Sequence, residues 1–88
     1  IVTIDNETLQ VINDPVIISR GFIYMRDHNE LTKEMAQLVS SVVTKKNNQL
    51  KKLNVNILKR EITKQLKDFI QEKTERNPMI MPVIMTVN

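Results

Sequence analysis

The sequence predicts an α+β fold, with a small three- to four-stranded β-sheet and two α-helices packed on one face, in the order β-β-β-α-α-β. Two observations carry this prediction. Runs rich in β-branched residues lie near both ends of the chain and are typical of strands. Two central stretches repeat apolar residues at helical spacing. Because the helices follow one another, we expect them to lie together on one side of the sheet.

Three strand candidates open the chain. Residues 2–4 and 9–12 flank the polar segment 5–8, and this pattern predicts a hairpin. After a proline break, residues 16–25 are rich in β-branched and aromatic side chains and form the strongest strand candidate. Gly21 in its middle indicates a bulge or a close backbone contact.

The first predicted helix covers about residues 28–46. Apolar residues recur through 31–43 on one helical face, and Asp27 with Glu30 matches a capping box, in which a side chain caps the helix start. Residues 45–52 are polar and basic, so we expect them to form a frayed end or a connector.

A second helix is predicted to begin near Asn54 or Asn56, since either side chain can cap it, and to end before Pro78. Residues 79–87 are predicted to form the last strand. Pro82 interrupts this strand. Because proline cannot donate a ladder hydrogen bond, we expect an edge position or a bulge there.

Both long strand candidates are apolar on both faces. Two helices cover one face of such a sheet, and a contiguous apolar patch left on the other face marks an interface. Methionine adapts well to such surfaces. The alternative is that the helices, hairpin and loops cover both faces themselves. In the last strand candidate, Ile80 and Ile84 are predicted to point to one face, and Met79, Met81, Val83, Met85 and Val87 to the other. The interface candidates are Met79, Met81, Val83 and Met85.

Charge is unevenly distributed along the chain. Residues 1–34 hold three basic and six acidic side chains, whereas residues 45–67 hold eight basic side chains and one acidic one. A basic segment can meet polyanions such as RNA, and the alternative is a solvated helix face. The candidates for contact with an RNA backbone are Lys51, Lys52, Arg60 and Lys64.

The composition argues against an active site within this chain. It contains one histidine, His28, one glycine and no cysteine, so we expect no catalytic residue, no cofactor site and no metal site. Phe22 and Tyr24 have the spacing of a base-stacking pair, although two strand aromatics are more often part of a core.

The length and hydropathy of the chain indicate how many domains it forms and whether it crosses a membrane. The 88 residues suffice for a single domain, 1–88, and the start at Ile1 indicates a fragment of a larger chain. No apolar run reaches the ~20 residues that span a bilayer, so we expect no membrane partner. The absence of cysteine favours a cytoplasmic location.

Two motifs resemble the end of bacterial ribonuclease J. The first is Arg-Gly-Phe-x-Tyr-x-Arg at residues 20–26, and the second is Glu-Lys-Thr-x-Arg-x-Pro, followed by apolar triplets around a second proline, at residues 72–85. The family-motif residues are Arg20, Gly21, Phe22, Tyr24, Lys73, Thr74, Arg76, Pro78 and Pro82.

This resemblance implies a parent in the metallo-β-lactamase/β-CASP ribonuclease family, a 5′-3′ exoribonuclease and endoribonuclease of mRNA decay and rRNA maturation. It places zinc or manganese in upstream domains and none in this fragment. It also implies a non-catalytic C-terminal domain that supports dimerisation and full activity. The partner would be the same or a paralogous ribonuclease J chain, in a homo- or heterodimer, and RNA would be met through the parent.

Two positions and one segment depart from the family pattern, and the segment is residues 27–48, which are less acidic than the resemblance leads us to expect. Asn77 replaces a commonly basic residue, and Thr86 replaces a commonly acidic one. These departures favour the less active paralogue. The remaining alternative is an unrelated α+β adaptor that recruits another protein.

Overall fold

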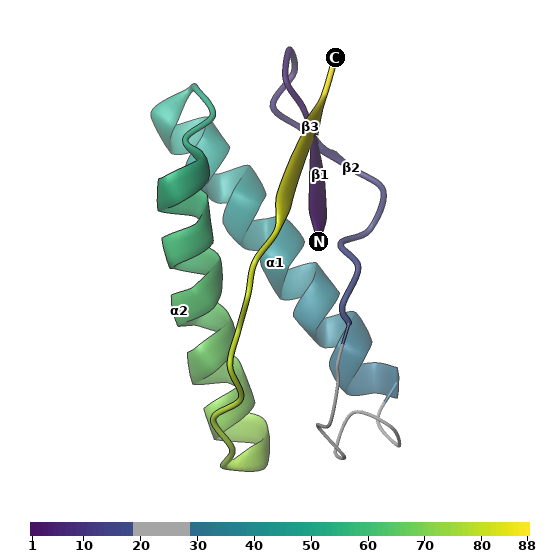
Figure 1. The fold of residues 1–88 in the computed structure, drawn as a ribbon, viewed down its shortest axis with the longest axis vertical. Helices are drawn as coiled ribbons and strands as arrows, with labels where there is room; N and C mark the ends of the chain where they lie inside the picture. Colours follow the sequence, from purple (N-terminus) through teal and green to yellow (C-terminus); the bar gives the residue numbers. More distant parts are fainter. Residues whose placement is uncertain (19–28) are drawn as a thin grey trace.

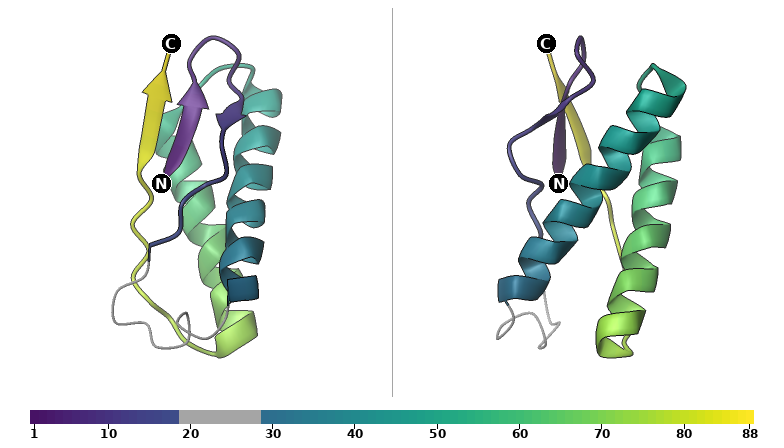
Figure 2. Two further views of the ribbon diagram at one scale, coloured as in Figure 1. Left: turned by 90° about the vertical axis from the view of Figure 1, so that its right-hand side faces the viewer. Right: turned by 180° about the vertical axis from the view of Figure 1, so that it is seen from behind.

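Two helices form one layer of the molecule and a three-stranded sheet forms the other (Figures 1 and 2). The computed structural model describes residues 1–18 and 29–88. The described elements, in chain order, are β1 (Val2–Asp5), β2 (Val11–Ile12), α1 (Asn29–Leu50), α2 (Val55–Thr74) and β3 (Ile84–Val87). This arrangement confirms the predicted α+β class with both helices on one side of the sheet.

The sheet is built around β1, which lies between β2 and β3. β2 pairs with β1 in the antiparallel direction, with Ile4 opposite Val11. β3 pairs with β1 in the parallel direction, with Val2 opposite Ile84. A parallel pair needs a long crossover connection, and the two helices lie within that connection.

The turn between β1 and β2 is held by the Asp5 carboxylate, which confirms the predicted polar turn. One Asp5 oxygen accepts hydrogen bonds from the backbone N–H groups of Glu7, at 2.8 Å, and Thr8, at 3.0 Å. The backbone N–H of Leu9 then donates to the Asp5 carbonyl at 2.8 Å, and Leu9 takes a left-handed φ of 62°. This Asx-type turn reverses the chain without glycine.

The core consists of one apolar stripe from each helix packed against β1. Each stripe recurs at about every fourth residue, which is the spacing of a single helical face. In β1 the alternate residues Val2 and Ile4 point into this core, since successive strand side chains point to opposite faces. The buried apolar residues are Val2, Ile4, Leu31, Met35, Val39, Val43, Leu58, Ile62, Leu66 and Ile70.

Both ends of α2 have specific caps. The Asn54 side chain accepts a hydrogen bond from the Ile57 N–H at 3.1 Å, which confirms one of the two predicted N-caps. At the other end, Glu75 adopts a left-handed conformation and its N–H donates to the Gln71 carbonyl at 2.8 Å. α2 therefore ends at Thr74, three residues before Asn77, the residue that precedes Pro78.

Four predicted boundaries were wrong. The second strand, β2, begins at Val11 and not at residue 9. α1 continues to Leu50, so most of the predicted connector at 45–52 is helical. Residues 79–83 form no strand, because the ladder with β1 begins only at Ile84. Residues 16–18 are irregular. The remainder of the predicted third strand, the proposed capping residue Asp27 and the aromatic pair Phe22 and Tyr24 lie outside the described residues.

Asn47 extends the α1 stripe by one polar residue. Its side chain is 4% exposed, and its Nδ2 donates to the Leu9 carbonyl at 2.9 Å. This hydrogen bond joins the last turns of α1 to the β1–β2 turn. Because the Leu9 carbonyl would otherwise lack a hydrogen-bond donor, this bond favours one arrangement of the helix layer against the sheet layer.

We predict that Asn47→Ala lowers the free energy of unfolding by about 1–3 kcal/mol, because the Leu9 carbonyl loses its donor. Chemical denaturation of the two proteins measures the difference. Asn48→Ala, at the neighbouring exposed position, is the control and should change stability by less than about 0.5 kcal/mol. Equal effects of the two substitutions would contradict the assigned role of Asn47.

We also predict a lowered pKa for Asp5, because the backbone N–H of Thr8, and then that of Glu7, stabilise its carboxylate. Because the pKa of Asp5 is lower in the folded state than in the unfolded state, its ionised carboxylate stabilises the turn at pH values above the ordinary carboxyl pKa. This stabilisation is lost as the pH falls through the folded value. An NMR titration of the Asp5 carboxyl carbon gives the folded pKa directly. A midpoint at or above the ordinary value would contradict the prediction.

Candidate functional site

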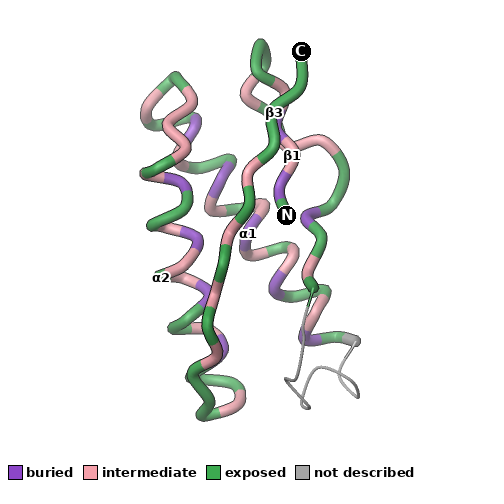
Figure 3. The backbone as a smooth tube through the Cα atoms, viewed as in Figure 1, coloured by how far each residue is buried: buried purple, intermediate pink, exposed green. Residues whose placement is uncertain are grey.

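The C-terminal segment presents a row of apolar side chains to solvent. Its side chains alternate, as Figure 3 shows by the change between exposed and intermediate residues. Ile80 and Ile84 pack against the core. The other set, which we call the methionine face, is exposed by 86% at Met79, 78% at Met81, 47% at Val83 and 53% at Met85.

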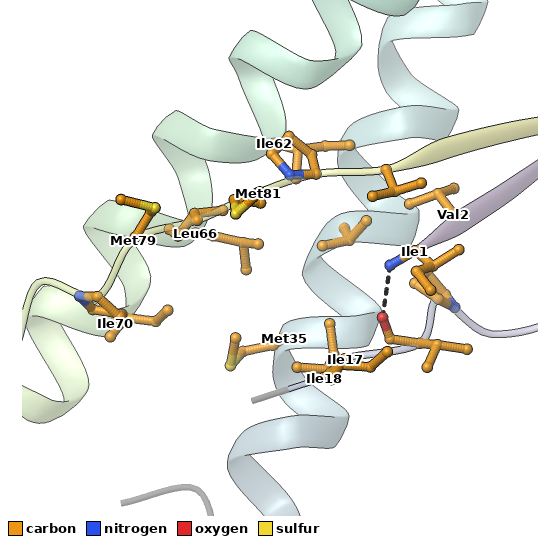
Figure 4. A pocket seen from close by; sticks show the side chains of 17 residues that line it. Ile1, Val2, Ile17, Ile18, Met35, Ile62, Leu66, Ile70, Met79 and Met81 are labelled. Carbon is orange, nitrogen blue, oxygen red and sulfur yellow. Dashed lines mark hydrogen bonds between the residues drawn. The ribbon is translucent and has the colours of Figure 1, made fainter. Parts of the chain in front are cut away.

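A hollow of about 440 Å³, which we call the apolar groove, lies along the C-terminal segment, and Met79, Met81 and Val83 of the methionine face are among the residues that line it. One wall is the C-terminal segment from Pro78 to Val83, and the opposite wall is formed by Ile1 and residues 15–18. The helices supply its floor, including Met35 and Leu66 (Figure 4). The groove is therefore lined by apolar side chains from every layer of the fold.

Two backbone hydrogen bonds position the N-terminal wall of the apolar groove. The amino nitrogen of Ile1 donates to the Val16 carbonyl at 2.7 Å (Figure 4). The Val16 N–H donates in return to the Ile1 carbonyl at 2.9 Å. Ile1, Val16 and Ile18 are all exposed. The exposed apolar surface thus extends across both walls. The interface candidates chosen from the sequence did not include these three residues, although Val16 and Ile18 lie within the strand candidate 16–25 and Ile1 adjoins the one at 2–4.

α2 carries a second distinctive surface on its outer side. Lys59, Arg60, Lys64 and Lys67 are all exposed there, and we call this set the basic face. They line a shallow groove of about 610 Å³ together with Thr63, Asp68 and Pro82. Arg60 and Lys64 were predicted candidates. Lys67 joins them because it lies three residues after Lys64 and seven after Arg60, spacings that place residues on one side of a helix. Lys59 lines the same groove.

The basic segment predicted at 45–67 does not form one surface. Lys46 lies 3.8 Å from Glu61 in an ion pair between the helices. Lys45 borders a separate polar hollow that includes Asp14. Lys51 and Lys52 occupy the turn between α1 and α2, both exposed, at the end of α2 where the basic face begins.

The second family motif closes α2. The Thr74 hydroxyl donates to the Ile70 carbonyl at 2.8 Å and accepts from the Arg76 N–H at 3.2 Å. Lys73 lies 4.0 Å from the Glu34 carboxylate, and its ammonium group is 5.8 Å from the centre of the Phe69 ring, within range of a cation–π contact.

Two of the remaining motif residues line the apolar groove, and the other four lie outside the described residues. Pro78 and Pro82 line the apolar groove. Arg20, Gly21, Phe22 and Tyr24 lie outside the described residues.

Within residues 1–18 and 29–88, no group of three or more His, Cys, Asp or Glu side chains could hold a metal ion. In the same part of the chain, no helix is both long and apolar enough to cross a bilayer.

Comparison with known proteins places the chain in a family. The family model described as "Ribonuclease J C-terminal domain" matches residues 1–87. Ribonuclease J2 of Bacillus subtilis is 36% identical over 87 residues, covering 99% of this chain and 16% of that protein. Ribonuclease J 1 of Streptococcus pyogenes is 34% identical, covering 98% of this chain and 15% of that protein. The chain spans about a sixth of the length of these relatives, and it belongs to the ribonuclease J C-terminal domain family.

Proposed function

We propose that residues 1–88 are the non-catalytic C-terminal assembly domain of a longer ribonuclease J-type enzyme. The relatives' name supports a parent that hydrolyses RNA. We assign to that parent the 5′-3′ exonuclease and endonuclease activities of cytoplasmic mRNA decay and rRNA maturation. Its zinc or manganese would be held by domains upstream. Family membership excludes the earlier alternative of an unrelated adaptor.

The methionine face is the single observation that carries the assembly role. Transfer of apolar side chains out of water stabilises a complex by roughly 25 cal/mol per Å², and Met79 and Met81 are more than three-quarters exposed. Together with Ile1, Val16 and Ile18, these residues form an exposed apolar surface. Such surfaces are unusual on a monomeric protein and mark interfaces.

The proposed occupant of this face is a second ribonuclease J chain, either a copy of this one or a paralogue. In a two-fold dimer the same patch contacts itself, so an apolar patch is automatically complementary to its copy. Flexible methionine side chains can also interdigitate across such a contact. The apolar groove next to the methionine face supplies a depression into which side chains of the partner can insert.

We predict that the chain dimerises and that Met81→Glu weakens the dimer at least about 100-fold, because a carboxylate would be buried without a partner. Sedimentation equilibrium of the 88-residue chain measures the dissociation constant. Circular dichroism checks that each variant keeps its helices.

Two variants serve as controls. Met81→Leu keeps an apolar side chain and should leave the dimer intact. Gln37→Glu adds the same charge at an exposed position of α1 and should also have little effect. A monomeric wild-type chain, or equal weakening by Met81→Glu and Gln37→Glu, would refute assembly through the methionine face.

A further inference from the structure

The basic face of α2 has no role in the assembly proposal. Arg60, Lys64 and Lys67 follow one another at helical spacing, and Lys59 lies beside them. Over the seven residues from Arg60 to Lys67, α2 rises by about 10 Å. The cations therefore form a stripe along the helix, and Pro82 of the C-terminal segment borders it.

These cations are not neutralised within the described part of the chain. The two ion pairs found there are Lys46–Glu61 and Lys73–Glu34, and neither involves the basic face. One carboxylate, that of Asp68, lines the same groove. Arg60 and Lys64 are one helical turn apart, and like charges at this spacing repel each other. A bound polyanion would remove that repulsion.

We propose that the basic face binds the phosphate backbone of an RNA strand. The choice of RNA as the polyanion rests on the proposed function, in which the parent hydrolyses RNA. Contact with phosphates positions a strand without reading its sequence, so the domain would hold RNA of any sequence alongside the parent enzyme. Lys51 and Lys52 lie in the turn that precedes α2, at the same end of the helix as Lys59 and Arg60, and add two exposed cations there.

The composition of the basic face favours a phosphate backbone over an acidic protein. Protein interfaces centre on buried aromatic and aliphatic anchors and are depleted in lysine. Among residues 1–18 and 29–88, the groove of the basic face contains Thr63 and Pro82 besides its charged residues, and no aromatic side chain. The absence of aromatic residues from this groove also argues against base stacking. Phosphate contact is the remaining mode for three lysines and an arginine.

The test uses the full-length protein that carries this domain and a labelled polyuridine strand, with a chelator present to prevent cleavage. Fluorescence anisotropy over a range of salt concentrations gives the affinity and its salt dependence. Each lost phosphate contact lowers the slope of log K against log salt by about 0.7 for a single strand. Arg60→Gln/Lys64→Gln should therefore reduce the slope by about 1.4 and weaken binding at low salt by about tenfold or more.

Matched variants separate the basic face from net charge. Lys33→Gln/Lys45→Gln removes two charges from exposed positions of α1 and should leave the slope nearly unchanged. Arg60→Lys/Lys64→Arg keeps both charges and should retain binding. Glutamine is a good helix former, so the test variant should keep its fold, and circular dichroism verifies this.

Two outcomes would overturn the proposal. One is equal slopes for Arg60→Gln/Lys64→Gln and the α1 control. The other is displacement of polyuridine by polyglutamate as effectively as by unlabelled RNA, which would assign the face to acidic protein. Sedimentation equilibrium of the same variants reports assembly separately, so a failure of RNA binding is distinguishable from a failure of the assembly role.

Discussion

The packing of β1 against the two helix stripes determines which surfaces the molecule exposes. β1 is the central strand, and its buried residues Val2 and Ile4 contact a single layer of helices. Because strand side chains alternate, the same packing directs Thr3 and Asp5 away from the helices. The neighbouring strand β3 is in parallel register with β1, so the methionine face follows from a core that has one layer of helices.

The C-terminal segment shows what sequence periodicity can and cannot predict. An extended chain has a period of two whether or not it is hydrogen-bonded, so the prediction that Met79, Met81, Val83 and Met85 oppose Ile80 and Ile84 was correct. The prediction of a continuous strand was wrong. Backbone pairing depends on a neighbour, and the partner strand β1 begins at Val2, which faces Ile84. The identity of a partner strand is not encoded in the local pattern.

The ends of the helices were predicted less well than their stripes, for a related reason. Glycine is the usual residue in the left-handed position that ends a helix, and here Lys51 and Glu75 take that position instead, with φ values of 55° and 59°. The sequence therefore has no glycine to mark the C-terminal end of α1 or of α2. The stripe of α1 also continues through a polar residue, Asn47, whose burial depends on its hydrogen bond to Leu9 in the distant hairpin.

The basic segment illustrates why a count of charges along a sequence differs from a charged surface. Lys46 is paired with Glu61, and Lys45 lines a separate hollow formed by α1 and Asp14. The continuous run therefore separates into a stripe on α2 and two lysines at the turn. Pro82 borders both the apolar groove and the basic face. The two proposed surfaces therefore adjoin, and a dimer formed through the methionine face would bring the basic faces of both copies beside the same interface. If both proposals hold, each copy holds phosphates next to the proposed dimer contact.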